Sequence, residues 1–377
     1  KVETTMEKHS MNNNKHVYAL ILAGGGGTRL WPKSREKTPK QFLKLGQDKT
    51  LLRATAERVC TLVDWNHVYV ITNITQLQDV ERELPEVSKD HILCEPRKRE
   101  TAMALAVGAL VIQERDPDAV VMNFASDHIV TDIEEFKRVM QVAAENATDP
   151  NIMVTVGISP TFPHTGLGYI KSGKKLRQTQ GLPVFQVDNF TEKPNEETAK
   201  AFLKIGTYFW NANNYVWSCK AITAAFLKHA PKTADVLDEL RKYIGKDTWK
   251  SALEKAYDSV ESISIDYAIS EKAENLVIIP GNFGWNDIGD WKVVYDLSAK
   301  DGQGNVVLRE EKEGELIQHG SHHNLVNVNG RLIALVDVEN MIIIDTPEIL
   351  MIAPKDRSQD VKKIVEKLKN ENRKTYL

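Results

Sequence analysis

The stretch Leu22-Ala23-Gly24-Gly25-Gly26-Gly27-Thr28-Arg29-Leu30-Trp31-Pro32 continues an apolar run that begins at Val17. An apolar run that ends in glycines is typical of a buried strand followed by a turn, and glycine lets backbone N–H groups approach a phosphate because it has no Cβ. The spacing fits neither a Walker loop nor a dinucleotide fingerprint. Instead, Arg29 follows the glycines and Lys40 lies eleven residues further on. We therefore expect a strand and turn that bind a triphosphate with two cations.

Strands and helices alternate after this turn. Apolar runs predict strands at Val68–Thr72, His91–Glu95, Ala119–Ala125 and Ile152–Ile158, and helical patterns predict helices at Leu51–Val63, Thr101–Arg115 and Ile133–Ala147. Nearly continuous apolar strands separated by helices indicate an α/β fold whose parallel sheet is covered on both faces. Ligands of such sheets bind beyond the carboxyl ends of the strands. The glycine cluster, Glu95 and Asp127 all lie at such ends.

The last part of the chain has a different character. Short β-branched runs, several of them separated by Gly and Asn, predict strands at Val306–Leu308, Asn324–Val328, Leu332–Val338, Met341–Asp345 and Ile349–Ala353. An amphipathic helix is predicted at Gln359–Lys369. We expect either a short solenoid or a small sandwich here. At the other end, the polar segment 1–15 has no apolar h-region, and we expect it to be disordered or derived from an expression vector.

Composition excludes several classes of protein. The 377 residues are 42% hydrophobic and 27% charged, with a net charge of −3. Such a balance supports neither nucleic-acid binding nor attachment to an anionic membrane, and no apolar run approaches the roughly 20 residues of a membrane span. The three cysteines, Cys60, Cys94 and Cys219, form no Cys-x-x-Cys pair. They fit buried thiols of a cytoplasmic protein better than a zinc or redox site.

Two aspartates are candidate metal ligands. Asp127 follows a buried strand in Ser126-Asp127-His128, and Asp287 lies in the run Gly284–Gly289. Together they could bind one Mg²⁺, a hard cation that takes carboxylate and phosphate oxygens. The alternative for Asp127 is a helix N-cap, although Asp132 can fill that role for the next helix. Spacing alone leaves the choice open.

A carboxylate and a cation stand side by side in Thr191-Glu192-Lys193-Pro194. Neighbours on an extended segment point to opposite sides unless a turn rotates them. The functional interpretation is that Glu192 accepts from sugar hydroxyls and Lys193 pairs with a sugar phosphate, whereas an exposed pair of loop charges is the alternative. Asn211, between aromatic residues, could present a donor and an acceptor to the same sugar.

Eight motifs occur together in one order, and their combination is far more specific than any of them alone. They are the glycine run to Pro32, Pro39-Lys40-Gln41-Phe42, Glu95-Pro96, Ser126-Asp127-His128, Thr165-Gly166-Leu167-Gly168-Tyr169-Ile170, Glu192-Lys193-Pro194, Ser264-Ile265-Asp266-Tyr267 and Trp285-Asn286-Asp287-Ile288-Gly289. From about Leu20 to Trp291 the chain thereby resembles the sugar-nucleotide pyrophosphorylases, and among them the mannose-1-phosphate guanylyltransferases.

The resemblance implies a fold and a division of the chain. Residues 16–291 would form a Rossmann-like nucleotidyltransferase catalytic domain with a mostly parallel mixed sheet. Residues 292–377 would form a small β-rich C-terminal domain with a terminal helix. In this family a left-handed β-helix often follows the catalytic domain and supports oligomerisation, so the resemblance also suggests a homodimer through the C-terminal domain.

The resemblance also assigns roles to residues of this sequence. Arg29 and Lys40 would hold the triphosphate, and Asp127 and Asp287 would ligate Mg²⁺. The nucleotide would contact Leu22, Ala23, Gly24, Gly25, Gly26, Gly27 and Thr28, with Glu95, Pro96, Arg99 and Thr101 around the guanine. Gly168, Glu192 and Asn211 would read the hexose, and Lys193 would bind its phosphate. The catalytic set is then Arg29, Lys40, Asp127, Lys193 and Asp287.

Three positions depart from the family pattern. Gly26 stands where the family usually has Ser, Glu100 where it has Asn, and Ala212-Asn213 where it has Ser-Gly. These departures leave the proposed metal ligands and cations unchanged, but they affect the loop, the nucleotide segment and the sugar segment.

The implied reaction joins GTP and mannose 1-phosphate into GDP-mannose and releases pyrophosphate. The attacking phosphate oxygen is already anionic, so the reaction needs no general base, and positioning and charge neutralisation should dominate catalysis. Two alternatives remain open. One is a pyrophosphorylase for another sugar 1-phosphate or nucleoside triphosphate, and the other is a non-catalytic nucleotide-sugar sensor.

Overall fold

The computed structural model describes residues 14–25, 27–309 and 314–377, which fold into two compact units. The sheet unit contains the described residues up to Gly24, together with Thr55–Ser126 and Val130–Trp285. The tail unit contains Gly25–Ala54, Asp127–Ile129 and the described part of Asn286–Leu377. The tail unit therefore takes in segments that follow two strand ends of the sheet unit. The predicted division of this chain into a catalytic domain (residues 16–291) and a C-terminal domain (residues 292–377) stays a prediction.

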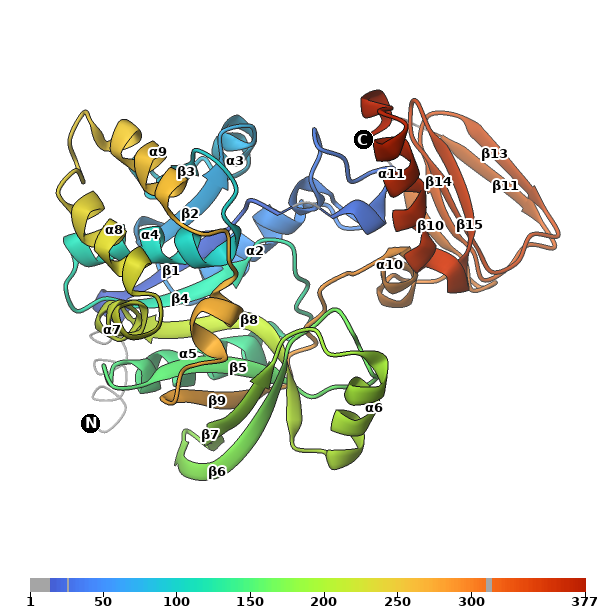
Figure 1. Cartoon of the computed structure of the whole chain (residues 1–377). Helices are drawn as coiled ribbons and strands as arrows, with labels where there is room; N and C mark the ends of the chain where they lie inside the picture. The colour runs from blue at the N-terminus through green and yellow to red at the C-terminus, as the bar shows by residue number, and fades with distance from the viewer. Residues whose placement is uncertain (1–13, 26, 310–313) are drawn as a thin grey trace, which may run out of the picture. The chain divides into compact units, whose positions relative to one another are not determined.

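A mixed sheet of nine strands forms the centre of the sheet unit, in the order β3-β2-β1-β4-β8-β5-β9-β7-β6 (Figure 1). Its strands are β1 (Val17–Leu22), β2 (Val68–Asn73), β3 (Ile92–Glu95), β4 (Val120–Ala125), β5 (Met153–Ile158), β6 (Tyr169–Thr179), β7 (Leu182–Thr191), β8 (Tyr208–Ser218) and β9 (Leu276–Gly281). β7 and β8 pair antiparallel with their neighbours, whereas β3, β2, β1 and β4 form a parallel series. The predicted α/β class with a mostly parallel sheet is confirmed.

Helices cover both faces of this sheet. They are α2 (Leu51–Val59), α3 (Leu77–Glu83), α4 (Glu100–Arg115), α5 (Ile133–Ala147), α6 (Glu196–Ile205), α7 (Cys219–His229), α8 (Pro231–Arg241) and α9 (Trp249–Ser259). The helix expected to reach Val63 ends at Val59. The backbone then forms a 3-10 turn, in which each N–H bonds to the carbonyl three residues back: Thr61 N donates to Arg58 O, and Leu62 N donates to Val59 O. The predicted cap of α5 is confirmed, since Asp132 accepts from Glu135 N at 3.0 Å.

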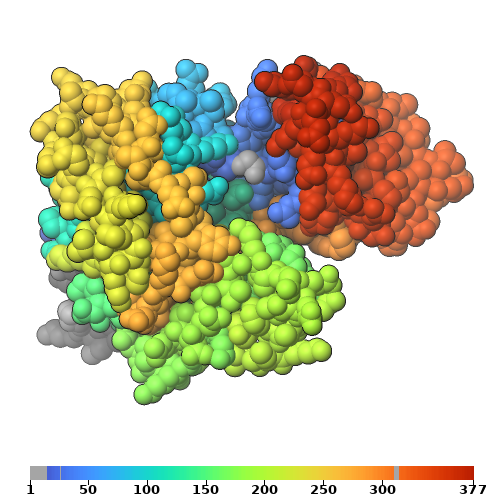
Figure 2. Space-filling view, in the orientation of Figure 1, coloured from blue at the N-terminus to red at the C-terminus, as the bar shows by residue number. Residues whose placement is uncertain are grey.

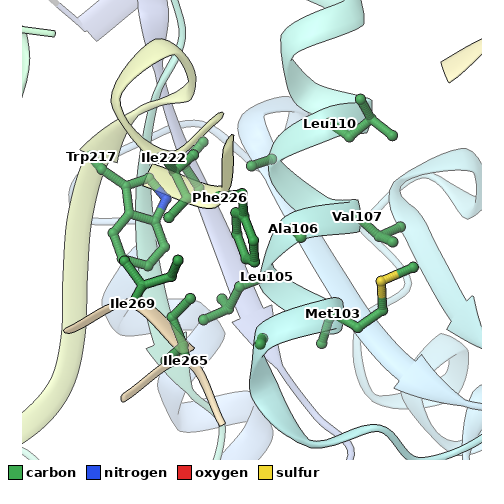
Figure 3. Packing of buried hydrophobic residues seen from close by; sticks show 14 of the residues in the cluster. Met103, Leu105, Ala106, Val107, Leu110, Trp217, Ile222, Phe226, Ile265 and Ile269 are labelled. Carbon is green, nitrogen blue, oxygen red and sulfur yellow. The ribbon is translucent and has the colours of Figure 1, made fainter. Parts of the chain in front are cut away.

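The main core of the sheet unit lies between the sheet and helices α4, α7, α8 and α9. α4 is apolar on nearly every side and packs against α7 and α8 as well as β1 and β2. Figure 3 shows Leu105 and Ala106 of α4 facing Phe226 of α7, beside Trp217 of β8. On the opposite face, α5 packs against β4, β5, β8 and β9. Side chains that follow one another along a strand point to opposite faces, so each strand contributes to both cores.

The tail unit contains a two-sheet solenoid. Its strands are β10 (Val306–Arg309), β11 (Glu315–His319), β12 (Leu325–Val328), β13 (Leu332–Val336), β14 (Met341–Asp345) and β15 (Leu350–Pro354). β10, β12 and β14 pair in parallel, with β15 antiparallel at the edge, and β11 pairs in parallel with β13. Because the strands from β10 to β14 alternate between the two sheets, the chain coils. Of the two forms expected from the sequence, the solenoid is therefore observed.

Both faces of the β10-β12-β14 sheet are buried. Leu325 and Ile342 belong to one apolar cluster, whereas their neighbours Val326 and Ile343 belong to another cluster inside the coil. The first cluster also contains Trp291 of α10 (Trp291–Leu297) and Val365 of α11 (Val361–Asn370). Figure 2 shows the terminal helix in red against the orange strands. The amphipathic helix predicted at the end of the chain is thus confirmed, with Val361 and Val365 buried in the same cluster as Leu325 and Ile342.

Asparagine side chains link successive turns of the coil. Asn305 and Asn324 are buried, and Asn324 N donates to Asn305 Oδ1 at 2.8 Å. In the next turn, Met341 N donates to Asn324 Oδ1 at 2.9 Å. These bonds satisfy backbone groups where the chain leaves one sheet for the other. None of the described helices is both long and apolar enough to span a membrane.

Candidate active site

The glycine loop begins where β1 ends. Ala23 N donates to Ile71 O at 2.8 Å, and Thr72 Oγ1 donates to Ala23 O at 2.9 Å, so the neighbouring strand β2 fixes the start of the loop. Gly24 is the last residue of the first segment of the sheet unit. A Cβ added to Gly24 would stand 3.5 Å from Glu95 Oε2, which is an ordinary contact. The predicted nucleotide segment Leu22–Gly24 is therefore next to the end of β3.

The rest of the loop belongs to the tail unit, and Gly26 lies outside the described residues. At Gly27 an added Cβ would stand 2.7 Å from Lys40 Cβ, closer than a real Cβ can approach. Gly27 is therefore required by the lysine stem. Thr28 and Arg29 follow in the short 3-10 helix η2 (Thr28–Leu30).

Lys40 is buried and pairs with both segments that carry the predicted metal ligands. Its Nζ lies 2.9 Å from Asp127 Oδ2 and donates to the backbone carbonyl of Asp287. Burial alone would raise the pKa of Asp127, but the charges of Lys40 and His128 and the hydrogen bond from Lys40 bring it below its usual value of 3.8. Asp127 is therefore ionised at neutral pH.

These carboxylates suit a hard divalent cation. Among the described residues no cluster of three or more His, Cys, Asp or Glu side chains could hold a metal. That Asp127 and Asp287 together ligate Mg²⁺ stays a prediction, which their chemistry fits because this ion keeps several waters and takes carboxylate and phosphate oxygens as ligands.

In the sheet unit, Glu95 ends β3 as a buried carboxyl. Tyr257 OH donates to Glu95 Oε1 at 2.9 Å. Burial raises the pKa of Glu95 to about 7, although the bond from Tyr257 and the charge of Lys98 oppose the rise. The sequence singled out Glu95 but missed Tyr257, whose position in α9 gives no local signal.

The predicted nucleotide segment after Glu95 is tied to Tyr257 of α9 and to Ile265 of the Ser264-Ile265-Asp266-Tyr267 motif. Arg99 Nε donates to the backbone carbonyl of Tyr257 at 2.7 Å, and Thr101 Oγ1 accepts from Ile265 N at 2.9 Å. Between them, Glu100 has a φ of +56°, in the left-handed region. Asparagine, the usual family residue here, adopts this region more readily than glutamate does.

Glu192 and Lys193 lie side by side at the end of β7. The turn that the sequence left open is present, since Lys193 has a φ of +46° and its Nζ reaches 2.8 Å from Glu192 Oε1. Burial and the charge of Asp266 raise the pKa of Glu192, while Lys193 lowers it, and the net shift is upward. A Cβ on Gly168 would stand 2.5 Å from Glu192 Oε2. Gly168 therefore leaves room for this carboxylate.

Asn211 is buried in a polar network beside this pair. Its Nδ2 lies 3.0 Å from Asp266 Oδ1 and 3.1 Å from Tyr215 OH, and Tyr215 OH donates to Asp266 Oδ1 at 2.6 Å. Asn211 Oδ1 accepts from Asn213 N at 3.1 Å. Asn211 is thus held firmly by the protein, and its contact with a hexose stays a prediction. Asp266 belongs to the motif Ser264-Ile265-Asp266-Tyr267, but the sequence alone assigned no role to its carboxyl group.

Each unit therefore has its own set of predicted site residues. In the sheet unit the structure brings together Glu192 with Lys193 and Gly168, and Gly24 with Glu95. In the tail unit it brings Lys40 together with Gly27, Asp127 and the backbone of Asp287. Charged groups at strand ends and a glycine loop are features of enzymes that handle phosphates, and together with the α/β fold they indicate a nucleotide-binding enzyme.

Comparisons with known proteins identify the family. The nucleotidyl transferase family model matches residues 18–304, and the model for the MannoseP isomerase/GMP-like beta-helix domain matches residues 314–368. The mannose-1-phosphate guanylyltransferase of Escherichia coli (strain K12) is 33% identical over 364 residues, covering 95% of this chain and 74% of the relative. The xanthan biosynthesis protein XanB of Xanthomonas campestris is 36% identical over 359 residues, with the same two coverages of 95% and 74%.

A solved structure also supports this family assignment. The crystal structure of a Thermus thermophilus protein, described as a mannose-1-phosphate geranyltransferase, superposes with a TM-score of 0.82 at 30% identity, over 94% of this chain and 99% of that one. The chain belongs to the nucleotidyl transferase family, and within it to the mannose-1-phosphate guanylyltransferases. The match of the second model also confirms the β-rich domain that was expected after the catalytic domain.

The pKa of Glu95 predicts a pH-dependent stability. The folded protein holds this proton more tightly than the unfolded chain, whose glutamate has a pKa of 4.5, so the free energy of unfolding should fall as the pH rises from 4.5 to about 7. Glu95→Gln should remove this loss, because the amide oxygen still accepts from Tyr257 and carries no charge. The variant should gain up to about 3 kcal/mol relative to the parent between pH 5 and pH 8, measured by urea unfolding. A difference that does not change with pH would contradict the prediction.

Proposed function

We propose that this enzyme makes GDP-mannose and pyrophosphate from GTP and mannose 1-phosphate, with Mg²⁺ as its metal. The observation that carries the proposal is the buried Lys40, which is paired with Asp127 and the backbone of Asp287 and whose stem lies against Gly27 of the glycine loop. The names of the relatives support the choice of mannose and guanosine. Under this proposal the chain binds neither nucleic acid nor membranes.

In the proposed mechanism, a phosphate oxygen of mannose 1-phosphate attacks the α-phosphorus of GTP in line. A new oxygen–phosphorus bond forms as the bond from the α-phosphorus to the oxygen that bridges it to the β-phosphorus breaks, and that oxygen leaves with pyrophosphate. Arg29 and Lys40 stabilise the charge on the leaving group, and the backbone of Leu22–Thr28 positions the phosphates. Asp127 and Asp287 would hold Mg²⁺, which supplies further positive charge to the phosphate oxygens when it is bound.

Other predicted residues would recognise the base and the sugar. Glu95, with Pro96, Arg99 and Thr101 nearby in sequence, would border the guanine, whose N1–H and N2–H₂ groups are donors. Gly168, Glu192 and Asn211 would select the hexose, and Lys193 would bind its phosphate. The position of Lys193 supports this role: its Nζ lies 2.8 Å from Glu192 Oε1, so a phosphate bound by the ammonium would lie beside the carboxylate that would accept from the hexose hydroxyls.

Two wider proposals concern assembly and location. Ile317, Leu332 and Val336 of β11 and β13 are all more than half exposed, which supports a homodimer through the C-terminal domain. Sedimentation of the full chain at several concentrations would test it. We also propose that the enzyme acts in the cytoplasm, which fits its three free thiols, Cys60, Cys94 and Cys219.

One assay tests the proposed reaction. The chain should release pyrophosphate and form GDP-mannose when it is incubated with GTP, mannose 1-phosphate and Mg²⁺. It should form GDP-mannose faster than GDP-glucose or UDP-glucose in a panel of sugar 1-phosphates and triphosphates. Faster turnover of another pair would assign a different pyrophosphorylase activity, and binding of a nucleotide sugar without any turnover would favour a sensor.

Asp127→Asn should lower Mg²⁺-dependent turnover about 10²- to 10³-fold, because it removes one oxygen charge from the metal and leaves Lys40 without its carboxylate. Initial rates over a Mg²⁺ titration measure this effect. Asp132→Asn is the matched control, since asparagine caps α5 as well as aspartate does. Equal metal dependence of the Asp127 variant and the parent would refute the assignment.

Lys193→Met keeps the stem of the side chain and removes its charge. If Lys193 binds the sugar phosphate, the variant should lose about 10- to 100-fold in kcat/KM for mannose 1-phosphate, the value of one hydrogen bond to a charged group. Its KM for GTP should stay close to the parent value. Lys200→Met, which removes an exposed lysine paired with Glu196 on α6, is the control. Unchanged constants for both substrates would show that Lys193 has another role.

A further inference from the structure

Arg29, the cation of the glycine loop, is held by a side chain that lies 330 residues further along the chain. Its Nη1 donates to Gln359 Oε1 at 3.3 Å. Gln359 belongs to the 3-10 helix η7 (Lys355–Asp360), which follows the last strand of the solenoid. The C-terminal part of the chain therefore contacts a residue of the proposed triphosphate site within the tail unit.

The amide of Gln359 has a fixed orientation. Its Nε2 donates to Asp290 Oδ2, while its Oε1 accepts from Arg29. A guanidinium only donates and a carboxylate only accepts, so the reverse orientation would lose both bonds. Asp290 is itself buried and fixed, because its Oδ1 accepts from Lys292 N at 2.8 Å and Val293 N at 3.2 Å at the start of α10.

The neutral amide matters for the charge of Arg29. A glutamate at this position would form an ion pair with the guanidinium and compete with the phosphates for it. It would also place a second carboxylate against Asp290. Glutamine instead positions Arg29 and leaves its positive charge available to an anion.

The segment between Asp287, the proposed metal ligand, and Asp290 is strained. Ile288 has a φ of +44°, which is rare for a β-branched residue, and it is almost completely buried. Such a conformation persists only where its surroundings hold it. Here Ile288 N donates to Asn286 Oδ1 at 2.7 Å on one side, and Asp290, bonded to Gln359, anchors the other side. Gln359 thus contacts both Arg29 and the anchor of the segment that carries Asp287.

We propose that Gln359 is a positioning residue for the nucleotide, which orients Arg29 toward the triphosphate without neutralising it. The C-terminal part of the chain would then contribute to GTP binding as well as to folding. This inference rests on the proposed function, because it takes Arg29 as a ligand of the triphosphate and of the leaving pyrophosphate.

Two variants of the full chain test this role. Gln359→Met keeps the length of the side chain and removes both hydrogen bonds, and Gln359→Glu keeps the shape and adds a charge. Both should raise KM about three- to tenfold for GTP in the forward reaction and for pyrophosphate in the reverse reaction, as expected for one lost or neutralised hydrogen bond. Both variants should lower the melting temperature somewhat, because the buried Asp290 loses its amide partner. KM for mannose 1-phosphate should nevertheless stay at the parent value, which separates positioning of Arg29 from a general loss of structure.

Arg357→Ala is the matched control, because Arg357 lies in the same turn and pairs only with Asp360 in the described contacts. Its constants should equal those of the parent. An inactive parent would refute the proposed function, whereas an active parent with an unchanged Gln359→Met variant would refute the inference alone. Equal rises of all constants together with a lower melting temperature would show a structural role, and parent-like constants for Gln359→Glu would overturn the argument from charge.

Discussion

The buried ammonium of Lys40 is the interaction on which the charged groups of the tail unit depend. It gathers three segments that are distant in sequence, since it pairs with Asp127, bonds to the carbonyl of Asp287 and packs its stem against Gly27. A buried charge without partners would lose several kcal/mol of stability, so each segment must lie where it satisfies this cation. One lysine therefore explains both the glycine at position 27 and the placing of the predicted metal ligands.

Much of the fold could be predicted because its strands are buried on both faces and read as apolar runs. β2 and β5 are buried along their whole length, and the sequence located both within a residue or two. β11 (Glu315–His319) was missed because its side chains alternate between partly buried and exposed, so no apolar run marks it. The period of the solenoid was hidden for a related reason. Its register pairs Val306 with Leu325 and Leu325 with Ile342, which are steps of 19 and 17 residues instead of a constant repeat.

Around the predicted site residues, one local contact was anticipated from the sequence and two long-range contacts were missed. Glu192 and Lys193 are neighbours, so their pairing needed only a turn, which the backbone of Lys193 provides. Tyr257 and Asp266 bond to residues that are far away in the sequence. The bond of Tyr257 to Glu95 spans 162 residues, and the bond of Asp266 to Asn211 spans 55. No pattern of spacing in one sequence encodes such contacts, because they depend on how the helices after β8 return to the sheet.

The departures from the family pattern have different physical consequences. Asn213, where the family usually has glycine, has a φ of +54°, and asparagine tolerates this region, so the backbone is kept. Glu100, where the family usually has asparagine, keeps a φ of +56° with a longer side chain that favours it less, at a strain of about 1–2 kcal/mol. The residues on either side hold it there, because Arg99 bonds to the carbonyl of Tyr257 and Thr101 to Ile265. The strained geometry beside the proposed guanine site is therefore imposed by its neighbours rather than by the residue itself, which explains how the chain can change that residue and keep its backbone.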